Sequence, residues 1–417
     1  MNSNFSQTIT KSGIPLWTLN LPYANSVAVG ALVFAGTRDE IWPQEAGIAH
    51  ALEHMHFQGT ENFPTSKHIA EYIEEIGGNI NAITNSERTL YFSRVPVGYA
   101  ERAVRVINEQ IEKSVFPEEK IIIEMKNIVQ EIKRRNDNPQ NYLWKISNQF
   151  IYGEHPLFRD VLGIEESILK FTKNDFMTFK KRYYDPINYI FIIAGNISEE
   201  EALKLFNKYF TNKSKISSNQ RKNEKARLGA NKQFIENKEL NQLHISLSAL
   251  IGEGKGKSSL YLEFFNDMIS GGMSFPLFQE VRDKRGLCYS IGSSVIKRSD
   301  VGRFDVYIGT DPKKYKEAIE ATFEVIKKSK NDENLLNKVK NLKIGRLMLD
   351  YENTANIVKL AANDILFFGN PRGVEEIKKE IEEVTIENIK EAVNKYLKPE
   401  LIFTTMLAPL NFKENNN

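Results

Sequence analysis

The feature that most restricts the possible folds of this chain is a weak internal repeat, in which the second half of the sequence resembles the first. When the halves are aligned, the segment 124–131 lies over the segment 338–345, and both copies continue into a helical stretch that ends in an aromatic–glycine pair. The strand-like segment 27–36 also resembles the segment 243–252. Two copies of one pattern predict an α+β protein with two similar domains, each a mainly antiparallel sheet packed with helices.

The composition changes between the two copies. Residues 211–232 are polar and basic and contain almost no large apolar side chain. Such a segment is compatible with nucleic-acid binding, but it is more typical of a solvated linker. We therefore expect one domain over residues 1–212, a linker over 213–231 and a second domain over 232–417.

The overall composition is that of an ordinary globular protein. The chain has 56 basic and 54 acidic residues, a formal net charge of +2, one cysteine and no apolar stretch long enough to span a membrane. The charge balance gives no reason to expect nucleic acid or an acidic membrane as a partner. The first residues lack the basic and apolar pattern of a secretory signal. We therefore expect a soluble, cytoplasmic protein.

The clearest chemical signal is the sequence HALEH at residues 50–54, an H-x-x-E-H motif. Positions i and i+4 lie on one face of a helix, so His50 and His54 can direct both imidazoles at one ion. Glu53 shares that face without taking a ligand position. It is therefore a candidate general base that could act on a water held by the metal.

Two histidines do not complete a zinc site, because catalytic zinc commonly has three protein ligands and a water. The best candidate for the third ligand is Glu131, on a long charged helical segment (117–136) whose apolar residues, Ile122 among them, are expected on its inner side. Glu124 lies two turns earlier on the same face, where it could hydrogen-bond a ligating imidazole and hold its orientation. The alternative is a pair of structural histidines on one helix.

Several longer segments surround these residues. They are GTRDE (36–40), GIAHALEHMHFQGT (47–60), GGNINAIT (77–84), the Glu124 and Glu131 pair, HPLFRDVLGIEESI (155–168), AGNI (194–197) and GGMSFPLFQEVRDKRGLCYS (271–290). Together they resemble the insulinase/pitrilysin family of zinc metallopeptidases, which includes the mitochondrial processing peptidases. The resemblance extends from about residue 25 to 410.

The resemblance implies a role for each matching residue. It implies one zinc ion per chain on His50, His54 and Glu131, Glu53 as the base and Glu124 as the carboxylate behind the ligands. It also implies that Asn81 and Ala82 lie on an edge strand that binds peptide by strand addition. Arg282 and Tyr289 match a pair that donates hydrogen bonds to the substrate and to the oxyanion of the tetrahedral intermediate.

Three positions depart from the family pattern. His56 places an extra imidazole just after the motif, and we expect it to face outward. Cys288 stands where alanine is common, and we expect a small buried thiol. Phe275 and Pro276 are unusual in the glycine-rich segment. The histidines outside the motif, His56, His68, His155 and His244, are expected to be structural.

These features predict a zinc-dependent endopeptidase that hydrolyses short or unfolded peptides. One alternative is a dedicated precursor-processing peptidase subunit, and a less favoured one is a non-catalytic scaffold homologue. In larger family members the Arg/Tyr pair lies in the half opposite the zinc, so the resemblance implies a homodimer in which two chains share their sites. A heterodimer with another family member is the alternative.

Overall fold

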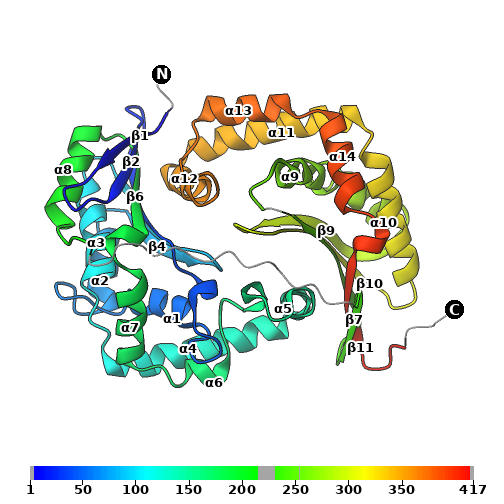
Figure 1. The fold of residues 1–417 in the computed structure, drawn as a ribbon, viewed down its shortest axis with the longest axis horizontal. Helices are drawn as coiled ribbons and strands as arrows, with labels where there is room; N and C mark the ends of the chain where they lie inside the picture. Colours follow the sequence, from blue (N-terminus) through cyan, green and yellow to red (C-terminus); the bar gives the residue numbers. More distant parts are fainter. Residues whose placement is uncertain (1–3, 215–230, 253, 414–417) are drawn as a thin grey trace. The chain divides into compact units, whose positions relative to one another are not determined.

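The computed structural model describes residues 4–214, 231–252 and 254–413, and these residues form two compact units. Each unit contains one sheet (Figure 1). Unit 1 comprises Met1–Arg134, Arg159–Lys222 and Leu347–Ile377, and unit 2 comprises Arg135–Phe158, Asn223–Arg346 and Lys378–Asn417.

Unit 1 contains a six-stranded sheet in the order β1-β2-β6-β3-β5-β4. All neighbouring strands are antiparallel except β2 and β6. The central strands are rich in β-branched and apolar residues, which suits strands that are buried on both faces. The strands are β1 (Ser6–Ile9), β2 (Pro15–Asn20), β3 (Ser26–Val33), β4 (Asn79–Thr84), β5 (Thr89–Pro96) and β6 (Tyr189–Gly195).

Unit 2 contains a five-stranded sheet in the order β7-β11-β8-β10-β9, and only β7 and β11 are parallel. This order repeats that of β2-β6-β3-β5-β4, and β6 and β11 begin at Tyr189 and Phe403, positions related by the same offset as the segments 124–131 and 338–345. The predicted repeat and the predicted α+β fold class are therefore confirmed. The strands are β7 (Gln233–Lys238), β8 (Leu243–Ile251), β9 (Cys288–Lys297), β10 (Gly302–Thr310) and β11 (Phe403–Pro409).

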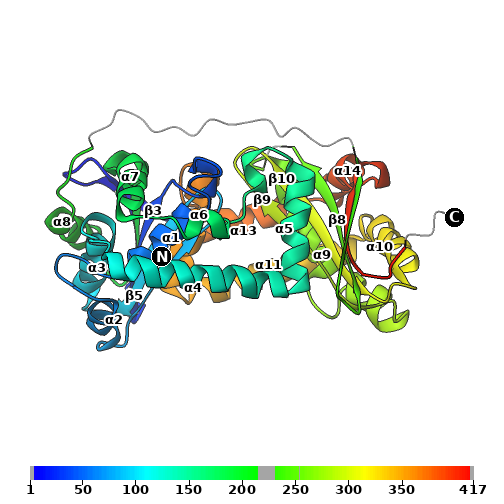
Figure 2. The same cartoon turned by 90° about the horizontal axis from the view of Figure 1, so that it is seen from below.

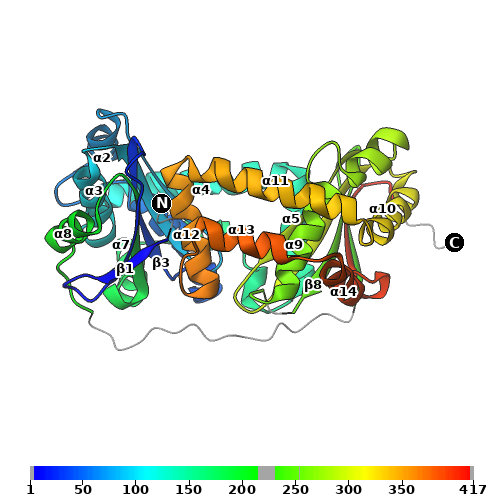
Figure 3. The same cartoon turned by 90° about the horizontal axis from the view of Figure 1, so that it is seen from above.

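Both faces of the sheet in unit 1 are covered by helices. The helices α1 (Ile48–Met55) and α3 (Ala100–Glu112) contribute to the core on one face. The helix α12 (Thr354–Phe368) packs on the other face against β3, β5 and β6 (Figure 1 and Figure 3). This second cover comes from the second half of the sequence.

Unit 2 receives the equivalent helix from the first half of the sequence. The helix α5 (Pro139–Tyr152), seen in Figure 2, packs against β8 and β11. Its residues Leu143 and Ile146 form a buried hydrophobic cluster with Leu407 of β11. The compact units therefore differ from the predicted consecutive domains 1–212 and 232–417, because one helical segment is exchanged in each direction. The predicted linker falls mostly outside the described residues.

One expectation for the remaining helices is corrected by the structure. Ile122 does not lie on the inner side of α4, because it is 60% exposed. None of the helices in the described ranges combines the length and the apolar character needed to cross a membrane. The helices not yet named are α2 (Ser66–Glu74), α4 (Glu118–Asp137), α6 (Glu165–Ile168), α7 (Lys173–Tyr183), α8 (Glu199–Tyr209), α9 (Lys257–Ser270), α10 (Tyr315–Ser329), α11 (Glu333–Tyr351), α13 (Val374–Glu383), α14 (Ile386–Tyr396) and a π-helix (Leu277–Lys284).

Candidate active site

The start of α1 is held in place by a buried carboxylate and two glycines. The side chain of Glu40 accepts hydrogen bonds from the main-chain N–H groups of Gly47 and Ala49, both at 3.1 Å. Gly47 has a left-handed φ of 92°, which favours glycine. A Cβ at Gly163 would lie 2.3 Å from the carbonyl oxygen of Ala46. The two glycines thus allow the close approach that fixes where the motif helix begins.

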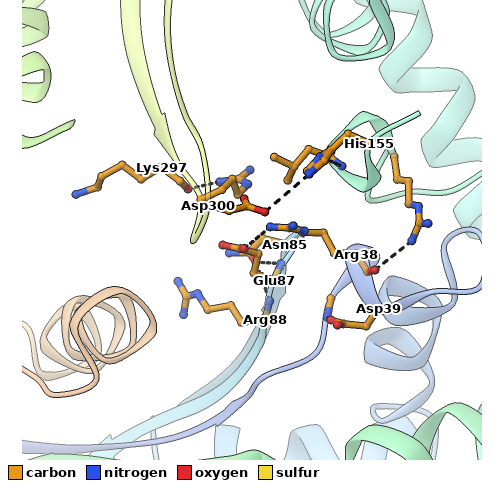
Figure 4. Close-up of polar contacts among 12 residues, drawn as sticks. Arg38, Asp39, Asn85, Glu87, Arg88, His155, Lys297 and Asp300 are labelled. Carbon is orange, nitrogen blue, oxygen red and sulfur yellow. Dashed lines mark hydrogen bonds and ion pairs between the residues drawn. The ribbon is translucent and has the colours of Figure 1, made fainter. Parts of the chain in front are cut away.

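The GTRDE segment fixes the turn between β4 and β5. A Cβ at Gly36 would lie 2.2 Å from the carbonyl oxygen of Asn85, so this close approach requires glycine. Arg38 donates to Glu87 at 2.7 Å, and both side chains are 1% exposed (Figure 4). A buried pair of this kind ties the turn firmly to the neighbouring segment. The edge strand β4 is therefore anchored at its C-terminal end.

His50, His54 and Glu131 come together in unit 1, and their potential ligand atoms all lie within 4.8 Å of one another. The two imidazole rings on α1 have centroids 4.6 Å apart. Glu131 reaches them because α4 packs into the core through Ile128 and Ile132. Two imidazoles and one carboxylate form a donor set that suits catalytic zinc. The residues that the sequence predicted as ligands thus fit the metal.

Glu124 lies behind one of the ligands, as predicted. One of its carboxylate oxygens is 3.3 Å from Nδ1 of His54, and the other accepts a hydrogen bond from Asn127. Because an ionised carboxylate can only accept, this contact places the hydrogen on Nδ1 and leaves Nε2 for a metal. Burial by itself lowers the pKa of His54, but Glu124 together with Glu53 and Glu131 raises it overall.

Glu53 lies beside this cluster and contacts the end of β4. Its carboxylate accepts a hydrogen bond from the hydroxyl of Thr84. Burial raises the pKa of Glu53 above its usual value, and the charge of Glu131 adds to this effect, while Thr84 and His54 oppose it. A carboxylate that is partly desolvated in this way is a stronger base than an exposed one.

Asn81 and Ala82 lie on β4, which is the last strand at one edge of the sheet. The Asn81 side chain is exposed, and its carbonyl oxygen accepts a hydrogen bond from the main-chain N–H of Ala82 at 2.8 Å. An edge strand presents unpaired main-chain groups to a further strand. The location fits the predicted peptide-binding edge.

Arg282 and Tyr289 lie in unit 2, whereas the cluster of potential metal ligands lies in unit 1. The Arg282 guanidinium is 5.5 Å from the centroid of the Tyr289 ring. Tyr289 is 72% exposed, so it is not the core aromatic that its hydrophobicity alone would suggest. Arg282 belongs to the π-helix, a rare geometry that is frequent at functional sites. The structure therefore brings the two residues together as an exposed pair.

Cys288 is next to this pair and is buried, as predicted. Burial raises the pKa of its thiol to about 11, so the reactive thiolate is scarce near neutral pH. Phe275, one of the two unusual residues in the glycine-rich segment, is also buried, and Lys338 lies over its ring. Both residues have the contacts of structural positions.

The expectation that His56 faces outward is wrong, because His56 is fully buried. Its Nδ1 is 2.7 Å from the hydroxyl of Tyr91, which is 2.9 Å from the hydroxyl of Tyr184. Burial lowers the pKa of His56 well below its usual value, so the imidazole is neutral. His56, the residue directly after α1, is therefore a polar core residue that contacts β5 through Tyr91, and Tyr91 in turn contacts Tyr184, the residue after α7.

The other histidines outside the motif have local partners. His68 Nδ1 is 2.8 Å from the Thr65 hydroxyl, and His244 Nδ1 is 2.8 Å from the Tyr307 hydroxyl. His155 lies 3.8 Å from Asp300 within unit 2 (Figure 4). Within the described residues, none of them belongs to a group that could hold a metal.

Three residues of this site were missed by the sequence analysis: Glu40, Thr84 and Tyr91. Thr84 lay within the quoted segment 77–84, and its position two places after Ala82 puts both side chains on one face of a strand. That spacing was an available signal. Glu40 binds main-chain N–H groups only seven and nine residues later, but a side-chain bond to the main chain leaves no residue pattern to read. Tyr91 contacts His56, 35 residues earlier, and the local pattern offers no signal for that contact.

Two family models and several known relatives match this chain. A family model described as "Insulinase (Peptidase family M16)" matches residues 17–164, and one described as "Peptidase M16 inactive domain" matches residues 170–343. A protein of Rickettsia bellii named an uncharacterized zinc protease is 36% identical over 317 residues, which are 74% of each chain. A protein of Bacillus subtilis with the same description is 31% identical over 91% of this chain and 92% of its own.

Solved structures show the same fold. A protease from Helicobacter pylori superposes with a TM-score of 0.88 at 20% identity, covering 97% of this chain and 100% of its own. A structure described as the peptidase M16 inactive domain from Pseudomonas fluorescens has a TM-score of 0.87 at 19% identity, covering 97% and 98%. Together with the two family models, these relatives establish that the chain belongs to the insulinase family of peptidases, family M16.

Proposed function

We propose that the chain is a zinc-dependent endopeptidase with one zinc ion, which hydrolyses short or unfolded peptides. The observation that carries this proposal is the convergence of His50, His54 and Glu131, with Glu53 beside them. Zinc bound there would supply a Lewis acid that lowers the pKa of water from 15.7 to about 7. The family resemblance implies the restriction to short or unfolded peptides, because larger family members form a closed chamber that a folded protein could not enter.

The side chains divide the chemistry among themselves. Glu53 is not one of the three clustered ligands, so its carboxylate remains available as a base. It accepts a proton from the attacking water and passes it to the leaving amine. Glu124 keeps the imidazole of His54 in the tautomer that leaves Nε2 available. The main chain of β4 binds the peptide backbone, so cleavage tolerates different substrate side chains.

Cleavage of a mixed pool of unrelated peptides by the purified chain tests this function. We expect internal cleavage products by mass spectrometry, their loss with a chelator and their return when zinc is added back. Cleavage of a single precursor only would favour the processing peptidase. Zinc binding without any cleavage would favour a scaffold homologue.

We also propose that the active enzyme is a homodimer that shares its sites between two chains. The Arg282 and Tyr289 pair lies in the unit without the metal cluster, and the family resemblance implies that such a pair serves a zinc in a facing half. Each chain then supplies a metal cluster to one site and an Arg/Tyr pair to the other. A heterodimer with another family member is the alternative.

Complementation between two inactive variants tests the sharing of sites. Glu53→Gln and Tyr289→Phe should each be inactive or nearly so, and mixing them should restore about a quarter of wild-type activity, because half of randomly exchanged dimers contain one intact site of two. Glu53→Gln mixed with Glu131→Gln is the matched control and should not recover, since both changes affect the same unit. With exchange confirmed by mass spectrometry of tagged subunits, equal activity in both mixtures would contradict the shared sites.

A further inference from the structure

Thr84 connects the candidate base to the candidate peptide-binding strand. It is the last residue of β4 and pairs with Thr89 of β5. Its hydroxyl donates a hydrogen bond to the Glu53 carboxylate. Glu53 therefore meets β4 at the last residue of the strand, through a side-chain hydroxyl.

The main-chain register of β4 shows which amides face the open edge. Asn85 donates its N–H to the carbonyl oxygen of Arg88 at 2.9 Å, so Asn85 and Arg88 form a hydrogen-bonded pair next to the turn between β4 and β5. Since bonded and non-bonded pairs alternate in an antiparallel ladder, Thr84 and Ala82 direct their N–H groups outward. The amide of Ala82 donates to the side-chain carbonyl of Asn81, and the next outward amide is that of Thr84.

The neighbouring hydrogen bonds fix the direction of the Thr84 hydroxyl. Thr89 Oγ1 lies 3.3 Å from Thr84 Oγ1 and donates to the carbonyl oxygen of Ala35 at 3.1 Å. The hydroxyl proton of Thr89 is therefore directed to Ala35 and not to Thr84. A carboxylate can only accept, so the Thr84 proton is directed to Glu53. The contact holds the ionised carboxylate in one orientation.

We propose that Thr84 is a positioning residue for Glu53 and marks the end of the peptide-pairing edge of β4. An extended peptide can replace the Asn81 carbonyl at the amide of Ala82, and the next outward amide belongs to Thr84, the residue whose hydroxyl binds Glu53. The register of the bound peptide is thereby set relative to the base. This inference rests on the proposed peptidase function.

The substitution Thr84→Val tests this role because it removes the hydroxyl and keeps the shape. We expect kcat to fall about 10- to 100-fold, the range expected for a lost hydrogen bond to a charged group, while KM changes by less than about twofold. Thr84→Ser keeps the donor and should stay within about threefold of wild type in kcat. Zinc content and the unfolding midpoint should match wild type in both variants.

The matched control is Thr18→Val in the same sheet. The Thr18 hydroxyl is buried and has no hydrogen-bond partner among the residues that the structure describes, so the same change there should leave kcat unaltered. If Thr84→Val does not fold, Thr84→Ala replaces it with the same expectation. The inference would be overturned if Thr84→Val kept the wild-type kcat or changed KM alone. It would also be overturned if Thr84→Val and Thr84→Ser lost kcat equally. Failure of the wild-type enzyme to cleave peptides would instead overturn the proposed function.

Discussion

The Glu53→Gln variant is expected to lose about 10²- to 10⁴-fold in kcat while it keeps its zinc. The amide has the shape of the carboxylate and can still accept the hydrogen bond from Thr84, but it cannot take a proton from water. Glu53 is also not one of the three clustered ligands, His50, His54 and Glu131. Loss of turnover without loss of metal therefore separates the base from the ligands.

The measurement combines steady-state cleavage of a fluorogenic peptide with metal analysis of the same preparation. Glu131→Gln is the matched control, since it makes the same chemical change at a proposed ligand. It should lose both activity and zinc, whereas Glu53→Gln should lose activity alone. Normal cleavage by Glu53→Gln would show that another group is the base, and loss of zinc by Glu53→Gln would show that Glu53 belongs to the metal site.

The Arg303→Met variant is expected to lower the free energy of unfolding by about 3–5 kcal/mol, the usual cost of breaking a buried ion pair. Arg303 is fully buried in β10, where its Nε is 2.7 Å from Asp305 and its Nη1 is 2.6 Å from Asn148. Asn148 lies on α5, the helix that the first half of the sequence supplies to unit 2. The substitution leaves Asp305 as an unpaired buried charge and removes a link to that helix.

Urea denaturation followed by circular dichroism measures this effect. The control is Arg285→Met, because Arg285 pairs with Glu324 on the surface, where ion pairs contribute little. It should leave the midpoint unchanged. The double variant Arg303→Met/Asp305→Leu should be more stable than Arg303→Met, since it removes the unpaired charge. A double variant less stable than the single one would contradict this explanation.

Much of the fold could be predicted from the sequence, because it follows from local patterns and from the repeat. The β-branched and apolar residues of the segment 26–34 predict a strand, and β3 lies there. The apolar spacing of the segment 100–114 predicts an amphipathic helix, and α3 lies there. The exchange of α5 and α12 could not be predicted. Both are apolar helices that follow similar segments, and hydrophobic spacing does not specify which of two similar sheets a helix will cover.

The candidate site, like the fold, could be predicted from the sequence only in part. The spacing of His50 and His54 determines that they share a helix face, so this part of the cluster was accessible from the sequence. The partner of Glu53 was not, because Thr84 reaches it from a strand that lies well separated from α1 in the sequence. The burial of His56 was also missed, since an imidazole among polar and apolar neighbours can face either way until its hydroxyl partner, Tyr91, is known.

The exchanged helices have a consequence for the unit of folding. A polypeptide ending in the linker would keep α5 without the sheet that α5 covers, and its own sheet would lack α12 over Ala28, Leu32 and Ile192. One copy of the repeat is therefore complete only in the presence of a second. The chain is equivalent to a domain-swapped dimer joined into one polypeptide, in which one copy carries the H-x-x-E-H motif and the other the Arg/Tyr pair.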